Sequence, residues 1–117
     1  MSTAHRYSDT VQNVLDALEK GVEPSRPALR DAVRELLADL RTHAPGRSVE
    51  VRIPPYGAIQ CIEGPRHTRG TPPNVVETDP TTWIEIATGR KSWHEAVIAG
   101  KIRASGVRAD LSAYLPL

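Results

Sequence analysis

The stretch "ETDPTTWIEIATGRKSWHEAVIAGKIRASG", residues 77–106, decides the fold because each of its elements carries its own start and stop signals. An Asp–Pro pair predicts the start of one helix, and Gly89 predicts its end. The S-x-x-E spacing that begins at Ser92 is typical of a capping box, so a second short helix is expected to run to Gly100. The "KIRAS" that follows is expected to form a strand. The stretch therefore predicts a helix, a second helix and a strand.

Upstream of this stretch the apolar residues alternate with polar ones, which predicts half-buried strands. Val49, Val51 and Ile53 form one such alternating set. The Pro-Pro pair that follows marks an edge, a bulge or a turn, because proline cannot donate to a strand ladder. A strand resumes at residues 58–62, and residues 74–78 form a short third strand.

The N-terminal third has helical periodicity. Residues 8–21 carry Val and Leu at helical spacing, start with the capping residues Ser8 or Asp9 and end at Gly21. A second helix begins at Pro27, expected at the first helical position, and ends before the Pro-Gly pair at residues 45–46. The expected order is two helices, three strands, two helices and a last strand. Strands grouped away from helices predict an α+β fold rather than an alternating α/β fold.

Bulk properties exclude several classes of protein. A chain of 117 residues predicts a single domain, residues 1–117, and a net charge of +1 argues against nucleic-acid binding. No apolar run is long enough to span a membrane, and the N-terminus has no secretory signal, so a cytoplasmic location is expected. The chain has no Phe, so Trp83 and Trp93 are expected to be the large buried anchors, both against the sheet.

The segment "EGPRHTRGTPPNVVETDP", residues 63–80, combines four prolines with the cations Arg66, His67 and Arg69. One interpretation is an anion site, since guanidinium groups match carboxylates and phosphates. The other is a stiff connector whose cations are solvated or paired with nearby acids. The sequence leaves both open.

Catalytic and metal chemistry find little support in the sequence. The lone Cys61 lies on the same strand face as Ile59, which predicts a buried thiol rather than a nucleophile. The other histidines share no ligand spacing, so no metal site, no cofactor and no catalytic residue is predicted.

With these elements in place, "ATGR…AVIAGKIRASG" resembles the signature of the sterol carrier protein type 2-like family, with both glycine stops and the last strand in register. "VEVRIPPYGAIQCIEGPRHTRGTPPNVVETDP" and the tail "RADLSAYLPL" are similar to a small bacterial branch of that family. The resemblance covers residues 27–117; residues 1–26 are expected to form a helical extension. It implies a twisted sheet of about four or five strands, with helices packed on one face and two N-terminal helices.

The resemblance also implies a non-catalytic carrier of a lipid, fatty acid or sterol-like ligand. The expected apolar cavity would be lined by Ile86, Val97, Ile98 and Ile102, with Arg66 or Arg69 at its mouth. The tail, with Tyr114 and Leu115, would be either a lid or a packed terminal turn. Two other readings stay open: an interaction module with a filled core that docks a protein through the basic loop, and an accessory domain of an enzyme.

Overall fold

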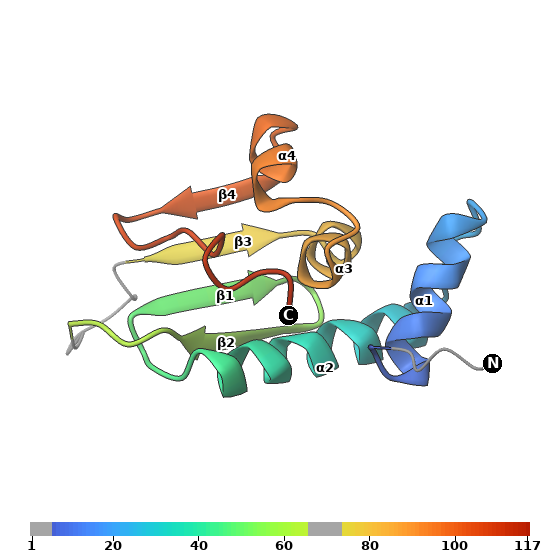
Figure 1. The fold of residues 1–117 in the computed structure, drawn as a ribbon, viewed down its shortest axis with the longest axis horizontal. Helices are drawn as coiled ribbons and strands as arrows, with labels where there is room; N and C mark the ends of the chain where they lie inside the picture. The colour runs from blue at the N-terminus through green and yellow to red at the C-terminus, as the bar shows by residue number, and fades with distance from the viewer. Residues whose placement is uncertain (1–5, 66–73) are drawn as a thin grey trace.

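The computed structural model describes residues 6–65 and 74–117 (Figure 1). The elements, in chain order, are α1 (Asp9–Glu19), α2 (Arg26–His43), β1 (Val49–Ile53), β2 (Gly57–Cys61), β3 (Val75–Thr78), α3 (Pro80–Thr88), α4 (Trp93–Ile98) and β4 (Ile102–Ser105). This order confirms the α+β prediction, including the two helices before the first strand.

The four strands of the described chain form one mixed sheet in the order β2-β1-β3-β4. β1 pairs antiparallel with β2 and parallel with β3, and β3 pairs antiparallel with β4. β1 and β3 are parallel because β2, which lies between them in sequence, runs back antiparallel to β1, and β3 then lies on the other side of β1. Neither the sheet order nor this parallel pairing was predicted from the sequence.

One face of the sheet is apolar and covered by helices. Val49, Val51 and Ile53 are all fully buried, as their alternation predicts. α2 and α3 lie over this face, and the C-terminal tail crosses it as well (Figure 1). Glu50 and Arg52 point to the opposite face, where they form an ion pair.

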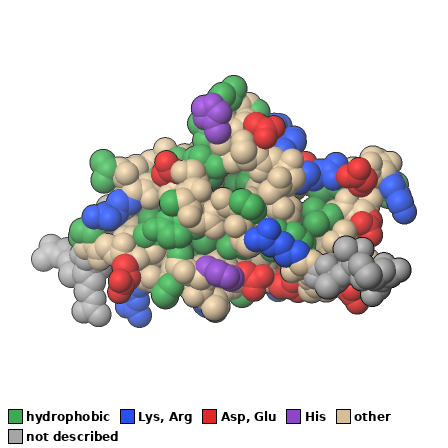
Figure 2. Space-filling model, viewed as in Figure 1, with side chains coloured by type: hydrophobic (Ala, Val, Ile, Leu, Met, Phe, Trp, Pro, Cys, Tyr) green, Lys and Arg blue, Asp and Glu red, His purple; other side chains and the backbone are tan. Residues whose placement is uncertain are grey.

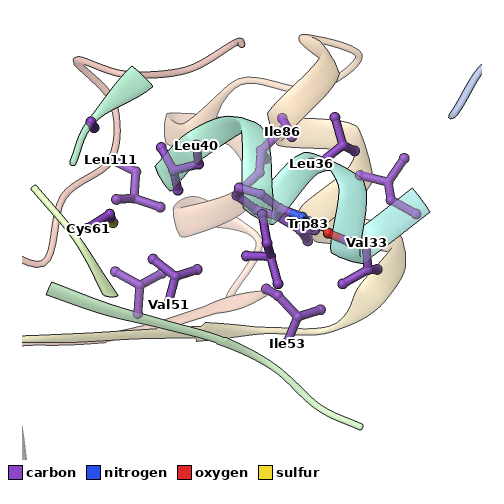
Figure 3. Packing of buried hydrophobic residues seen from close by; sticks show 14 of the residues in the cluster. Val33, Leu36, Leu40, Val51, Ile53, Cys61, Trp83, Ile86 and Leu111 are labelled. Carbon is purple, nitrogen blue, oxygen red and sulfur yellow. Dashed lines mark hydrogen bonds between the residues drawn. The ribbon is translucent and has the colours of Figure 1, made fainter. Parts of the chain in front are cut away.

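The space between the helices and the sheet is filled. Trp83 is fully buried, and its indole Nε1 donates a hydrogen bond to the carbonyl of Val33 at 3.3 Å. Side chains of α2, α3 and the strands converge around this ring (Figure 3). Because protein interiors pack at close to crystalline density, a large indole here leaves little room for a ligand.

Side-chain caps start each of the four helices found in residues 6–65 and 74–117. Ser8, Ser25, Asp79 and Ser92 each accept a hydrogen bond from a backbone N–H in the first turn. The helix predicted to start at Pro27 begins one residue earlier. Because Ser25 supplies the cap, the proline takes the second helical position, where an N–H is also dispensable.

The C-terminal tail is packed against the fold. Leu111 is fully buried, and the backbone N–H of Leu117 donates to the Ala87 carbonyl at 2.8 Å. The Tyr7 hydroxyl lies 3.2 Å from the carbonyl oxygen of Leu117. These contacts hold the tail at both of its ends.

Across residues 6–65 and 74–117, the helices lack the combination of length and apolar character that crossing a membrane requires.

Candidate functional site

The residues expected to line one cavity lie in different surroundings. Ile86 is only 1 % exposed and belongs to the filled interior. Val97 and Ile98 are 45 % and 71 % exposed on the outer side of α4. Ile102 is half-buried at the start of β4. The structure therefore does not bring these four side chains together around a common space.

The tail residues and the basic residues have separate positions. Tyr114 is exposed, whereas Leu115 is half-buried and lines a surface groove. Arg66, His67 and Arg69 fall outside the described residues. The choice between an anion site and a connector at that segment therefore stays a prediction.

The groove beside Leu115, called here the tail groove, is an open hollow of about 350 Å³ between the start of α4 and the tail. Its lining residues are Gly89, Lys91, Ser92, Trp93, His94, Glu95, Ser112, Leu115 and Pro116. The apolar part of the lining comes from Trp93, Leu115 and Pro116. Trp93 was expected to be buried against the sheet like Trp83, but it is only half-buried. At the first position of a six-residue helix, the ring lies at the margin of the core.

The apolar wall of the tail groove is held in place by backbone geometry. Gly89 ends α3 with φ of 80°, a left-handed conformation that is unfavourable for residues with a Cβ atom. A Cβ at this position would lie 3.2 Å from two ring carbons of Pro116. The glycine therefore both turns the chain and admits the tail, so that Leu115 and Pro116 can form one wall.

Polar side chains surround the apolar part. Glu95 accepts a hydrogen bond from the backbone N–H of Ser92 at 3.1 Å, and this bond lowers the pKa of the carboxyl group. Lys91 lies 3.6 Å from Glu85 and is half exposed, so this ion pair is weak. His94 is exposed. The Lys91 ammonium is therefore held only weakly by Glu85.

Comparison with family models assigns the chain to a protein family. The model described as Bacterial SCP ortholog matches residues 25–117. The chain belongs to this family. The match confirms the resemblance to a bacterial branch of sterol carrier proteins. It begins at Ser25, the cap of α2, so α1 lies outside the part that the family model matches. No curated protein matches the chain.

A second hollow of the protein lies between α3 and α4 and has a volume of about 570 Å³. Its acidic residues already have structural partners. Both carboxylate oxygens of Asp79 accept hydrogen bonds from Thr82, and Glu85 lies within 3.4 Å of Arg90. Because Asp79 caps α3 and Glu85 pairs with Arg90 just beyond the end of that helix, these carboxylates make a poorer binding set than the tail groove.

Cys61 has none of the properties of a nucleophile. The side chain is fully buried, and burial raises the pKa of the thiol to about 11. At neutral pH the group is therefore a protonated thiol, which is a weak nucleophile. The described residues also contain no group of three or more His, Cys, Asp or Glu side chains that could hold a metal ion.

Sequence reasoning missed Trp93, Lys91 and Pro116 as groove residues. The available signal was the capping box, because it placed Trp93 at the first position of a short helix, directly after the cap Ser92. A side chain at such a position has few neighbours on its own helix. The approach of Pro116 to Gly89 left no signal, because the two residues are distant in sequence.

Proposed function

We propose that this protein is a non-catalytic binding or carrier domain for a small amphipathic ligand, and that the ligand occupies the tail groove. The observation that carries the proposal is the composition of the groove. An indole, a leucine and a proline lie beside an ammonium group in one hollow. Small-molecule sites have this composition, with a mostly apolar lining and a few polar groups that fix orientation.

The residues suggest a division of roles within the groove. Trp93, Leu115 and Pro116 would contact an apolar chain, and burial of that chain would provide most of the affinity. Lys91 would hold an anionic head group such as a carboxylate. The volume of about 350 Å³ lies at the lower end of the range for ligand pockets, which favours a single medium-length acyl chain over a bulkier lipid.

The family assignment supports the class of ligand, because sterol carrier proteins carry hydrophobic molecules. The segment with Arg66, His67 and Arg69 remains a candidate for additional head-group contacts. If these cations contribute, replacing Arg66 and Arg69 together by Gln will weaken binding and leave the thermal melt unchanged.

Native mass spectrometry of freshly purified protein, followed by titration with decanoate, tests the proposal. Decanoate should change the fluorescence of Trp93, and the change should vanish in Trp93→Phe, which leaves Trp83 as the only indole. Lys91→Gln should weaken binding about tenfold, as expected for the loss of one charge-assisted hydrogen bond.

Two matched controls separate groove binding from a general effect. Leu115→Ser should weaken binding, whereas Val22→Ser, at an exposed apolar residue between α1 and α2, should not. Lys20→Gln, at the end of α1, is the charge control for Lys91→Gln. Equal affinity in the two groove variants and their two controls, or no binding at millimolar decanoate, would contradict the proposal.

The filled interior supports a second candidate, an interaction or accessory module that docks a protein partner or an enzyme subunit. Trp83 is fully buried among side chains of α2, α3 and the strands, in the space that an internal ligand would need. Purified protein that retains no small molecule, and that binds none on titration, would favour this candidate over the carrier.

A further inference from the structure

The two edges of the sheet are protected to very different extents. At the β2 edge, α2 runs alongside the strand (Figure 1). A Cβ at Gly57 would be 3.4 Å from Leu37 of this helix, and Arg34 Nε donates to the Tyr56 carbonyl at 2.8 Å. At the other edge, β4 is the last strand of the sheet, and no strand of the described chain pairs with its far side.

The register shows which backbone groups of β4 face outward. Glu50 N–H donates to the Asn74 carbonyl, so Asn74 and Val76 direct their backbone groups toward β1. Val75 and Glu77 must then direct theirs toward β4, where they face Ser105 and Arg103.

The alternation along β4 leaves Ile102 and Ala104 with their backbone N–H and C=O groups pointing away from the sheet. Such a row of outward groups is a template for another strand.

The side chains of β4 differ on its two faces. Ile102 and Ala104 lie on the same face as Val76 and Thr78, the face covered by helices. Arg103 lies on the opposite face, beside Glu77, and Glu77 lies beside Arg52. On the face without helices, the side chains of Arg52, Glu77 and Arg103 therefore alternate in charge from β1 to β4. The last of them, Arg103, is an exposed cation at the edge of the sheet.

Apolar surface flanks this edge. α4 rises at the end where β4 begins (Figure 1), and hydrophobic side chains appear over it in the space-filling view (Figure 2). Val97 and Ile98 of α4 are exposed. The Lys101 N–H donates to the Ala96 carbonyl at 3.0 Å, which fixes the turn that joins α4 to β4.

We propose that the β4 edge docks an extended segment of a partner protein, with an acidic residue between two apolar ones, by strand addition. The partner's backbone would pair with Ile102 and Ala104. Its acidic side chain would lie opposite Arg103 and continue the alternation of charge, and its apolar side chains would lie on the face of Ile102. In this mode of recognition, backbone hydrogen bonds provide affinity and alternate side chains provide specificity.

A second copy of this chain fits the edge poorly. In the two-fold antiparallel pairing that sets Ile102 against Ala104 of the other copy, Arg103 would face its own counterpart. Like charges directly opposite on neighbouring strands destabilise the pair. An acidic partner removes this repulsion and leaves the backbone pairing unchanged. The inference is independent of the proposed function, because Ile102, Arg103 and Ala104 do not line the tail groove.

The test uses the full chain and a labelled peptide containing Thr-Val-Glu-Val-Thr, followed by fluorescence anisotropy. Arg103→Glu should weaken binding about tenfold or more, and a peptide with Lys in place of Glu should bind this variant better than the parent protein. Arg103→Gln is a milder variant in case the reversed charge beside Glu77 lowers stability. Arg41→Glu, at an exposed cation in the last turn of α2, is the control and should leave binding unchanged.

Two further measurements separate strand addition from simple charge attraction. Hydrogen exchange at the amides of Ile102 and Ala104 should slow when the peptide binds. A peptide N-methylated at both Val residues should lose binding, since it keeps the charge but cannot donate to the edge. No binding at about 1 mM peptide, equal binding of the methylated peptide, or dimerisation of the free protein through this edge would each overturn the proposal.

Discussion

The interior under α2 and α3 and the margin formed by α4, β4 and the tail contain similar residues in opposite environments. Trp83 is fully buried and Trp93 half-buried, while Ile86 is 1 % exposed and Ile98 71 % exposed. Both parts carry side chains that could line a hydrophobic site. In the interior these side chains are buried against one another, and at the margin they are exposed at the surface. Buried packing and exposed apolar surface are therefore separated in this molecule, and each prediction below tests that separation.

The largest expected difference is between the two tryptophans. Trp83→Ala removes a fully buried indole and its hydrogen bond to the Val33 carbonyl, so it should lower the free energy of unfolding by about 3–5 kcal/mol. Trp93→Ala should cost clearly less, because part of its ring is already in contact with water. Urea unfolding of both variants measures the difference. Equal losses would show that the margin is as important to stability as the interior.

The two glycines that follow α3 and α4 give a smaller difference. Both have positive φ, 80° at Gly89 and 71° at Gly100, a conformation that glycine adopts readily.

Gly100→Ala should cost about 1 kcal/mol from backbone strain alone, since nothing lies within 4 Å of a Cβ there. Gly89→Ala should cost more, because its Cβ also meets Pro116. Thermal melts compare them, and a smaller cost at Gly89 would mean that the tail is not fixed there.

The smallest expected effect is the pH dependence of the stability that the capping box at the start of α4 provides. Hydrogen bonds from Ser92 lower the pKa of Glu95 from its ordinary value of 4.5. A carboxyl group whose pKa is lowered in the folded state stabilises the fold above that ordinary value, and the contribution is lost as the pH falls through the lowered pKa.

Glu95→Gln should therefore flatten the loss of stability below pH 4.5. Unfolding curves measured from neutral to acidic pH provide the test. If the free energy of unfolding falls with pH as steeply in Glu95→Gln as in the parent protein, the capping box does not contribute to the acid sensitivity of the fold.

Local signals in the sequence determined the elements of this fold. Ser92 with Glu95, Asp79 with Pro80, and the two glycine stops set helix boundaries through hydrogen bonds and dihedral angles that span only a few residues. The alternation in β1 determined which face of that strand is buried. The order of these elements predicted the α+β architecture, and the family signature then implied a twisted sheet with helices on one face.

The tertiary structure alone decided the surroundings of the apolar side chains. Ile86 and Ile98 belong to adjacent helices and have the same intrinsic hydrophobicity, but only Ile86 meets surfaces supplied by α2 and the sheet. The groove between Trp93 and Pro116 and the open edge of β4 likewise depend on segments that are distant in sequence. Burial is a property of the surface that faces a residue, so a local pattern can predict a helix and its apolar side without predicting what will cover it.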